Sequence, residues 1–358
     1  MSPWLWPAVL YAAILVLHLV VPARWVTGYV AHHETGEKLR YRLNGLRVLV
    51  LALAAWAAAC RFGGLAWDAF YAERWPMAGG ACVLGLVFTL AIVLPAPPVP
   101  GKPFLVQLYE GRWPNPQWLG GRLDAKMALY LVGAVMLELN VLSFAAHHVA
   151  LHPDDPSPGV FLYAALFSFF VAEYLNFEEV HLYTYDFMAE RVGFKLGWGC
   201  LVFYPFFYPV GLWGLADAPN PHTPAWLLAL YAATFFSGWV LSRGANLQKY
   251  WFKRDPSARA FGVLDPRPIS GGGRHVLSGG FWGLSRHINY LGEILMATGL
   301  ALSLGYPLAI APWLYPLYYV ALLFPRQADD DRRCAARYGE LWDEYCRRVP
   351  YRIIPFLY

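Results

Sequence analysis

Long apolar segments alternate with short polar ones along most of the chain. Each apolar segment approaches the roughly 20 residues that an α-helix needs to cross a bilayer. Nine such spans are predicted: Pro3–Val21, Gly45–Cys60, Met77–Leu94, Met127–Ala146, Gly159–Leu175, Trp198–Leu215, Ala225–Leu241, Tyr290–Leu304 and Tyr306–Phe324. Gly305 and Pro307 separate the last two spans, which predicts a tight hairpin. The pattern therefore predicts an all-α polytopic membrane protein with about nine to ten transmembrane helices.

The basic residues predict how these helices are oriented. If the spans alternate in direction, one set of loops comprises residues 22–44, 95–126, 176–197, 242–289 and 325–358. Of the 28 Lys and Arg residues, only Arg61 and Arg74 fall in the opposite loops, and Arg47 lies just inside a span. Cytoplasmic loops carry an excess of Lys and Arg. The basic set of loops, including the C-terminus, is therefore predicted to be cytoplasmic.

The amino-acid composition indicates a membrane protein and limits the classes of partner that it could bind. Charged residues make up 15% of the chain and hydrophobic residues 58%, whereas a soluble domain carries about 25% charged residues. A net charge of +4 is too small to indicate a nucleic-acid partner. The five cysteines show neither CxxC nor metal-site spacing, which predicts free thiols and gives no metal site. The sequence does not indicate the oligomeric state.

Three polar blocks fall on the predicted cytoplasmic side, where a soluble nucleotide could reach them. They are Gly244–Asp255, Ser278–Glu293 and Phe324–Pro355. In the first block, Lys249 and Lys253 are four residues apart and share one face of a helix. They are compatible with a phosphate clamp, or with an anchor of basic side chains at the membrane interface.

The other two blocks also allow a functional and a structural interpretation. Ser278–Glu293 contains four glycines, which let a backbone approach a ligand closely, but it could equally be a bent interfacial turn. In Phe324–Pro355, Arg326, Asp330, Arg333 and Arg337 have helical i, i+3/i+4 spacing. Asp330 could instead stabilise a helix N-terminus, and Tyr345 could belong to an aromatic belt.

A further polar cluster follows the fifth predicted span. So many polar groups at the end of a span predict a lined cavity, with a solvated loop as the alternative. Its members are Glu173, Asn176, Glu178, Glu179, His181 and Asp186.

Taken together, the motifs resemble the membrane sterol reductase family, which includes the sterol C14, C7 and C24(28) reductases and the lamin B receptor. The similar stretches run in one order from about Pro22 to Tyr358. They are TGEKLRYRLNG, NPQ followed by DAKM, NFEEVHLYTYDFMAERVGFKLGWG, GANLQKYWFKRDP, SGGFWGLSRHINYLGE and the C-terminal block ending in VPYRIIP. In size the chain is most like a bacterial sterol C14 reductase.

The resemblance implies NADPH-dependent reduction of a sterol carbon–carbon double bond, with the Δ14 bond as first choice. Asp330 matches the family's essential acid and Tyr345 its proton-donating tyrosine. Asn176 and Glu179 are expected to bind substrate. The positions that match the family's NADPH-binding residues are Lys249, Lys253, Trp282, Arg286, His287, Asn289, Arg326 and Tyr338. On this interpretation, residues 1–241 form the substrate-side half of one integral fold, and residues 242–358 form the cofactor-binding and catalytic half.

Three departures from the family pattern concern the substrate. Asp329 replaces an arginine, Pro325 a histidine and Cys200 an aspartate. The Δ7 and Δ24(28) bonds therefore stay open as substrates, and so do a non-catalytic sterol-binding scaffold and a membrane methyltransferase as functions.

An isolated alkene must be protonated before or while it accepts hydride. We expect Tyr345, polarised by a hydrogen bond to Asp330, to supply that proton to a sterol that enters from the bilayer lipid.

Overall fold

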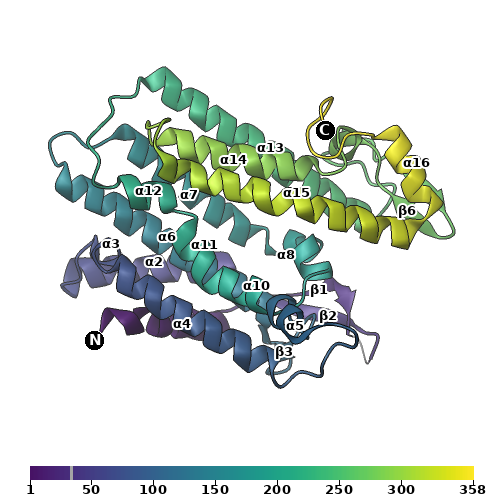
Figure 1. Cartoon of the computed structure of the whole chain (residues 1–358), viewed down its shortest axis with the longest axis horizontal. Helices are drawn as coiled ribbons and strands as arrows, with labels where there is room; N and C mark the ends of the chain where they lie inside the picture. The colour runs from purple at the N-terminus through teal and green to yellow at the C-terminus, as the bar shows by residue number, and fades with distance from the viewer. Residues whose placement is uncertain (33–34) are drawn as a thin grey trace. The chain divides into compact units, whose positions relative to one another are not determined.

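The computed structural model describes residues 1–32 and 35–358, which divide into two compact units, Met1–His222 and Thr223–Tyr358. Both units are mainly helical (Figure 1). The division falls just before helix α13, whereas the sequence placed the boundary between substrate and cofactor halves at residue 241, inside that helix.

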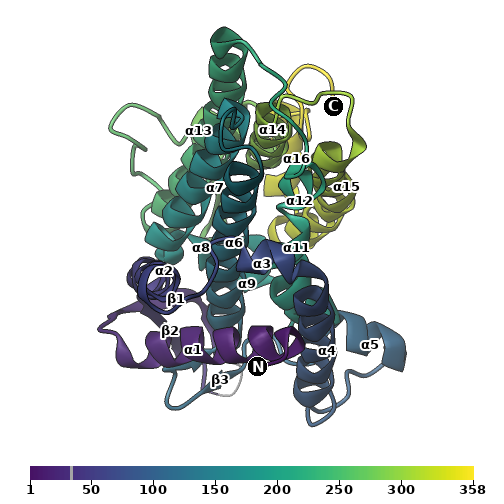
Figure 2. The same cartoon turned by 90° about the vertical axis from the view of Figure 1, so that its left-hand side faces the viewer.

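Helix α6, Ala125–Leu151, forms the core of the first unit. It packs against α1, α2, α3, α7, α11 and α12, and Figure 2 shows α6 and α7 side by side. Most of its side chains are buried, and Asp124 caps its first turn by accepting a hydrogen bond from the Met127 amide at 3.0 Å. The longer helices around it are α1 (Trp6–Val20), α2 (Gly45–Phe62), α4 (Arg74–Val93) and α7 (Pro158–Asn176).

Short elements complete the first unit. They are the 3₁₀ turn Pro3–Leu5, α3 (Ala69–Ala72), α5 (Phe104–Glu110), α8 (Glu178–His181), α9 (Tyr185–Met188), α10 (Phe194–Trp198), the π-helical turn Gly199–Phe203, α11 (Tyr204–Phe207) and α12 (Val210–Leu215). The predicted single span Trp198–Leu215 is thus broken into segments. Pro205 and Pro209 explain the breaks, because each lacks the N–H that an uninterrupted helix requires.

The fold is mostly helical, as expected, and within the described residues three short antiparallel hairpins accompany the helices. They are β1–β2 (Arg24–Ala31 with Lys38–Leu43), β3–β4 (Gln117–Trp118 with Leu123–Asp124) and β5–β6 (Ile269–Gly271 with Arg274–Val276). In β1–β2, Val26 pairs with Tyr41. Leu39, Tyr41 and Leu43 are buried, and the residues between them are more exposed, which is the period-two pattern of a strand.

Helices α13 (Ala225–Arg254), α14 (Ile288–Ser303) and α15 (Ile310–Tyr338) run side by side in the second unit, with α14 in the middle (Figure 1). Close contact between α13 and α14 depends on glycine, because a Cβ on Gly238 would lie 2.5 Å from the Gly292 carbonyl oxygen. Small residues of this kind let transmembrane helices approach closely. The unit also contains a 3₁₀ turn, Gly280–Gly283, and α16, Glu340–Arg348.

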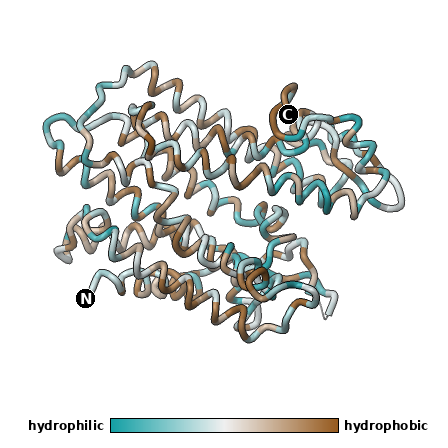
Figure 3. The backbone as a smooth tube through the Cα atoms, viewed as in Figure 1, coloured by the Kyte–Doolittle hydropathy of each residue, from teal (hydrophilic) through white to brown (hydrophobic). Residues whose placement is uncertain are grey.

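Seven helical segments among the described residues are long and apolar enough to cross a membrane. They correspond to the first seven predicted spans, from Pro3–Val20 to Ala225–Arg254. The eighth and ninth predicted spans are helical too, as α14 and the first half of α15. Hydrophilic residues gather where α15, α16 and hairpin β5–β6 lie, as the teal tube in Figure 3 shows. The protein is therefore a helical integral membrane protein with a polar end on its second unit.

Candidate active site

The C-terminal tail fixes the glycine-rich segment that precedes α14. Backbone amides of Arg286 and His287 donate to the carbonyl oxygens of Tyr351 and Arg352 at 3.0 and 2.7 Å. The buried Ser285 hydroxyl adds a third bond, to the Ile353 carbonyl oxygen, at 2.9 Å. Two sequence blocks that resemble family motifs, SRH and YRIIP, are therefore parts of one local structure.

His287 lies between two carboxylates of α15. Its Nδ1 is 3.8 Å from Asp330 and its Nε2 is 3.3 Å from Asp331, and its side chain is buried. Tyr290 stacks on the ring with centroids 5.1 Å apart. The imidazole of His287 is therefore within reach of both carboxylates.

Asp331 has the denser set of contacts of the two acids. It lies 3.6 Å from Arg286 Nη1 and accepts a 2.6 Å hydrogen bond from Gln327. Burial by itself raises the pKa of Asp331. The hydrogen bond from Gln327, the hydrogen bond and charge of His287 and the charge of Arg286 together outweigh burial, so the pKa of Asp331 is lowered. The carboxylate is thus held ionised.

This pKa shift predicts a pH-dependent contribution to stability. Because the folded-state pKa is depressed, the stabilisation is complete above the unfolded-state pKa of about 3.9 and is lost as the pH falls through the folded-state value. Thermal unfolding in detergent micelles from about pH 6 to about pH 3 should show a smaller loss for Asp331→Asn than for wild type. The exposed substitution Asp343→Asn should keep the wild-type profile, and an equal loss in Asp331→Asn would contradict this account.

Tyr345 does not make the contact expected from the sequence. Its hydroxyl donates to the Trp282 carbonyl oxygen at 2.8 Å, not to Asp330, whose ion-pair partner is His287. The ring is 2% exposed and packs in an apolar cluster with Ile269, Val276, Trp342 and Val349. The reason is the turn at Gly339, φ +54°, which lets α16 fold back onto hairpin β5–β6. Burial raises the pKa of Tyr345, so the phenol keeps its proton.

Four of the predicted cofactor residues form two contacts, and each contact joins a lysine of α13 to an aromatic side chain from another segment of the unit. Lys249 Nζ lies 5.4 Å from the centroid of the Trp282 ring, whose indole N–H donates to the Ala245 carbonyl oxygen at 2.8 Å. Lys253 Nζ donates to the Tyr338 hydroxyl at 2.8 Å. Arg326 is half-buried, one turn before Asp330 on α15.

Two further predicted residues carry buried polar atoms that are not satisfied. Arg286 Nη1 donates to Cys346 Sγ at 2.7 Å, but its Nε has no hydrogen-bond partner in the part of the chain that the structure describes. Asn289 makes one long bond, 3.4 Å from its Nδ2 to Asn246, and its buried Oδ1 has no partner within residues 1–32 and 35–358. Buried polar groups normally find partners. Two unsatisfied buried polar atoms in the unit that also carries Lys249 and Lys253 are compatible with a polar ligand.

Several supporting residues were missed from the sequence. Gln248, buried on α13, accepts from the Phe281 amide at 3.0 Å and donates to the Gly279 carbonyl oxygen at 3.1 Å. It thereby holds the glycine-rich turn against α13. Gln327, Asp331 and Cys346 were also not assigned roles. Their positions in the sequence could have indicated a role. Each lies inside a block that already carried candidate residues, and Gln248 directly precedes Lys249.

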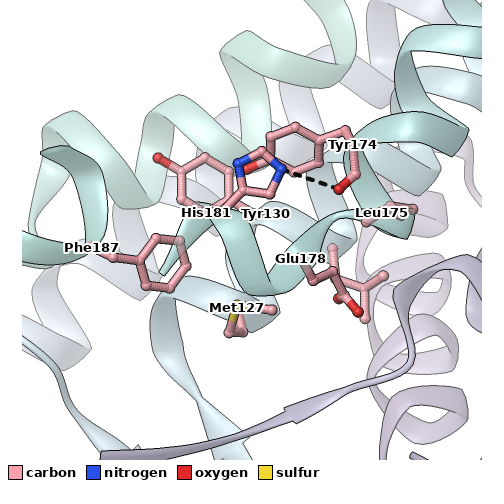
Figure 4. Close-up of a pocket in the computed structure, with 8 residues that line it drawn as sticks. Met127, Tyr130, Tyr174, Leu175, Glu178, His181 and Phe187 are labelled. Atoms are coloured by element: carbon pink, nitrogen blue, oxygen red, sulfur yellow. Dashed lines mark hydrogen bonds between the residues drawn. The ribbon is translucent and has the colours of Figure 1, made fainter. Parts of the chain in front are cut away.

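In the first unit, the predicted polar cluster after the fifth span does line a pocket. The pocket is small, with room for about one water molecule (Figure 4). Glu178 and His181 line it, and both belong to the polar cluster predicted after the fifth span. Asn176 is exposed at the end of α7, and Glu179 forms a 2.7 Å ion pair with Arg24. All five cysteines are free, as predicted.

Comparison with known proteins shows the family to which the chain belongs. A profile of the Ergosterol biosynthesis ERG4/ERG24 family matches residues 2–358. The chain is 33% identical over 372 residues to the Delta(14)-sterol reductase TM7SF2 of Mus musculus, an alignment that covers 100% of this chain and 86% of that protein.

Two more relatives come from a plant and a bacterium. The Delta(14)-sterol reductase of Arabidopsis thaliana is 30% identical over 347 residues, covering 95% of this chain and 91% of its own length. That of Methylotuvimicrobium alcaliphilum is 31% identical over 334 residues, covering 90% and 76%. The family profile spans residues 2–358, which is nearly the whole chain. The chain therefore belongs to the ergosterol biosynthesis ERG4/ERG24 family.

Proposed function

We propose that this protein reduces the Δ14 double bond of a sterol with NADPH as the hydride donor. The observation that carries the proposal is its similarity, over nearly the whole chain, to proteins named Delta(14)-sterol reductase. The second unit offers chemistry of the required kind: basic side chains, aromatic faces and a buried acid–imidazole cluster.

NADPH fits the donor set of the second unit. Lys249, Lys253, Arg286 and Arg326 supply positive charge for phosphates, and Trp282 and Tyr338 offer flat faces for its rings. Asn289 Oδ1 and Arg286 Nε are buried polar atoms that such a ligand would satisfy. When bound, NADPH supplies the hydride. The residues hold it in place, which brings the reacting groups together and lowers the entropic cost of reaction.

Tyr345 is the proposed proton donor. Its proton adds to C15 of the alkene, the positive charge develops at the more substituted C14, and hydride adds there. In this scheme Asp330 is a positioning residue. It acts through His287, whose ring it contacts together with Asp331, and His287 is next in sequence to Arg286.

The membrane setting completes the proposal. Counting α14 and the first half of α15 as spans adds two to the seven and gives nine, in keeping with the nine to ten transmembrane helices expected from the sequence. The segregation of basic residues supports a cytoplasmic location for the cofactor side. A sterol is itself a membrane lipid, so it would enter from the bilayer, and Asn176 and Glu179 stay proposed contacts on the substrate side.

The test is reduction of a Δ8,14-sterol diene by purified protein in lipid nanodiscs. We expect NADPH consumption and a product heavier by two hydrogens, with label from deuterated NADPH at C14 and from deuterated water at C15. Reduction of only Δ7 or Δ24(28) substrates would overturn the choice of bond. Sterol binding without NADPH consumption would indicate a scaffold, and stabilisation by S-adenosylmethionine instead of NADPH would indicate a methyltransferase.

A further inference from the structure

The segment that follows Tyr351 folds back on itself. The main-chain amides of Arg352, Ile353 and Ile354 all donate to the main-chain oxygen of Tyr358, at 2.7, 2.9 and 3.1 Å. Successive amides that point at one oxygen form a nest, which favours negative or partly negative groups. The Tyr358 amide donates in return to the Ile354 carbonyl oxygen at 2.9 Å. We call residues 352–358 the tail clasp.

The tail clasp contains a strained residue. Phe356 has φ +66°, in the left-handed region that bulky side chains rarely adopt. It is 83% exposed, so packing of its side chain does not explain this conformation. Strained backbone persists only where the surrounding structure enforces it. The main-chain hydrogen bonds on either side of Phe356 therefore hold the clasp closed.

The side chain of Tyr358 fastens the clasp to α15. Its ring stacks on Phe324, with centroids 5.3 Å apart and 22° between the ring planes. Its hydroxyl accepts a hydrogen bond from Arg352 Nη1 at 3.2 Å and donates a longer one, 3.4 Å, to Oε1 of buried Gln327. Phe324 and Gln327 are three residues apart on α15 and so share one face of it.

These contacts close a ring that passes through the candidate active site. Gln327 donates to Asp331 at 2.6 Å, and Asp331 lies 3.3 Å from Nε2 of His287. The His287 amide donates to the Arg352 carbonyl oxygen at 2.7 Å, and the Arg352 amide donates to Tyr358. His287 is therefore held from two sides, through its side chain and through its backbone. Tyr358 is the residue at which the two connections meet.

We propose that Tyr358 is a positioning residue for the cofactor site, which fixes the segment that carries Arg286 and His287 before a ligand binds. The inference rests on the proposed function for the identity of the cofactor. Tyr358 would act on NADPH through Arg286 and His287, because its own contacts are with the clasp and α15. Binding groups that are held in place in advance lose less entropy when the ligand arrives.

Hydrogen–deuterium exchange tests the clasp without a ligand. The amides of Arg286 and His287 are hydrogen-bonded to the tail, so they should exchange slowly in wild type. Tyr358→Ala should speed exchange of a peptide that contains them by roughly 3- to 10-fold. Leu357→Ala is the matched control, because Leu357 precedes Tyr358 and is 79% exposed. Equal exchange in Tyr358→Ala and wild type would overturn the assignment.

The effect on the cofactor is measured separately. Tyr358→Ala should raise the dissociation constant and KM of NADPH by roughly 3- to 10-fold, within the coupling found inside one hydrogen-bond network. The KM of the sterol and the melting temperature should change little. Tyr358→Phe keeps the ring on Phe324 and should recover most of the affinity. Equal increases in both KM values with a lower melting temperature would show a general structural role and contradict the proposal.

A double substitution tests the route through Arg286. Because Tyr358 and Arg286 belong to one network, Tyr358→Ala should weaken NADPH binding less in the Arg286→Met protein than in wild type. Losses that simply multiply would overturn the positioning role.

The clasp and the proposed function fail in different ways. Faster exchange in Tyr358→Ala, together with a wild type that binds no NADPH, would uphold the clasp and overturn the proposed function. NADPH binding and sterol reduction that are unaffected by Tyr358→Ala would overturn the positioning role alone.

Discussion

Replacing Tyr345 by Phe is expected to lower the rate of sterol reduction by roughly 10²–10⁴-fold, the usual contribution of a positioned proton donor. The substitution removes only the hydroxyl, whose described partner is the Trp282 carbonyl oxygen. The ring would stay in its apolar cluster with Trp342 and Val349. Turnover and NADPH affinity are measured separately, the latter by quenching of tryptophan fluorescence, and the affinity should change little.

The size of the loss of turnover distinguishes a catalytic role of the Tyr345 hydroxyl from a structural one. A neutral hydrogen bond contributes about 0.5–1.5 kcal/mol, so a structural role alone would lower the melting temperature slightly and leave most of the activity. Tyr351→Phe is the control, since it removes a tyrosine hydroxyl from the neighbouring tail. Strong residual turnover in Tyr345→Phe would exclude the hydroxyl as the proton source.

Replacing Arg286 by Met is expected to weaken NADPH binding by roughly 10- to 100-fold, the range for a lost charge-assisted hydrogen bond. Arg286 is 8% exposed, its backbone amide is held by the C-terminal tail, and its Nε has no partner within the described chain. Such a guanidinium is fixed in place before a ligand arrives. The measurement is the dissociation constant of NADPH from titration in micelles.

Arg332→Met is the matched control for Arg286. It also removes an arginine that lies near an aspartate, 3.2 Å from Asp329, but its side chain is 78% exposed. NADPH affinity should be unchanged in that variant. Equal affinities for wild type and Arg286→Met would remove this arginine from the cofactor site. Arg286→Lys should recover only part of the affinity, because an ammonium group lacks the planar fork of guanidinium.

The sequence predicted the helices better than their interruptions. Apolar runs located seven spans because burial in lipid requires long uninterrupted hydrophobicity. The β1–β2 hairpin was missed because charged residues alternate with its buried ones, and the basic loop was interpreted through its charge alone. The break at Pro205 and Pro209 was visible in the sequence, but hydropathy outweighed the proline signal.

The contacts of the candidate site were likewise predictable only in part. The sequence placed three polar blocks on one predicted side without pairing their residues. In the structure, Lys249 lies near Trp282 and His287 lies near Asp330. The same information could not orient Tyr345, since its direction depends on how α16 turns at Gly339 and packs on a hairpin that was not predicted. Support by Gln248 is likewise a tertiary contact, made across 33 residues of chain.

The glycine contact between α13 and α14 has a consequence for how the protein is made. At 1.5 Å per residue, the 16 residues of α14 span about 24 Å, less than the roughly 30 Å of a bilayer core. A short helix emerging from the ribosome has little tendency to enter lipid unaided. With 30-residue α13 already inserted, and with Gly238 allowing close approach, α14 can enter by packing against α13. Insertion of the second unit would then proceed in order along the chain, beginning with α13.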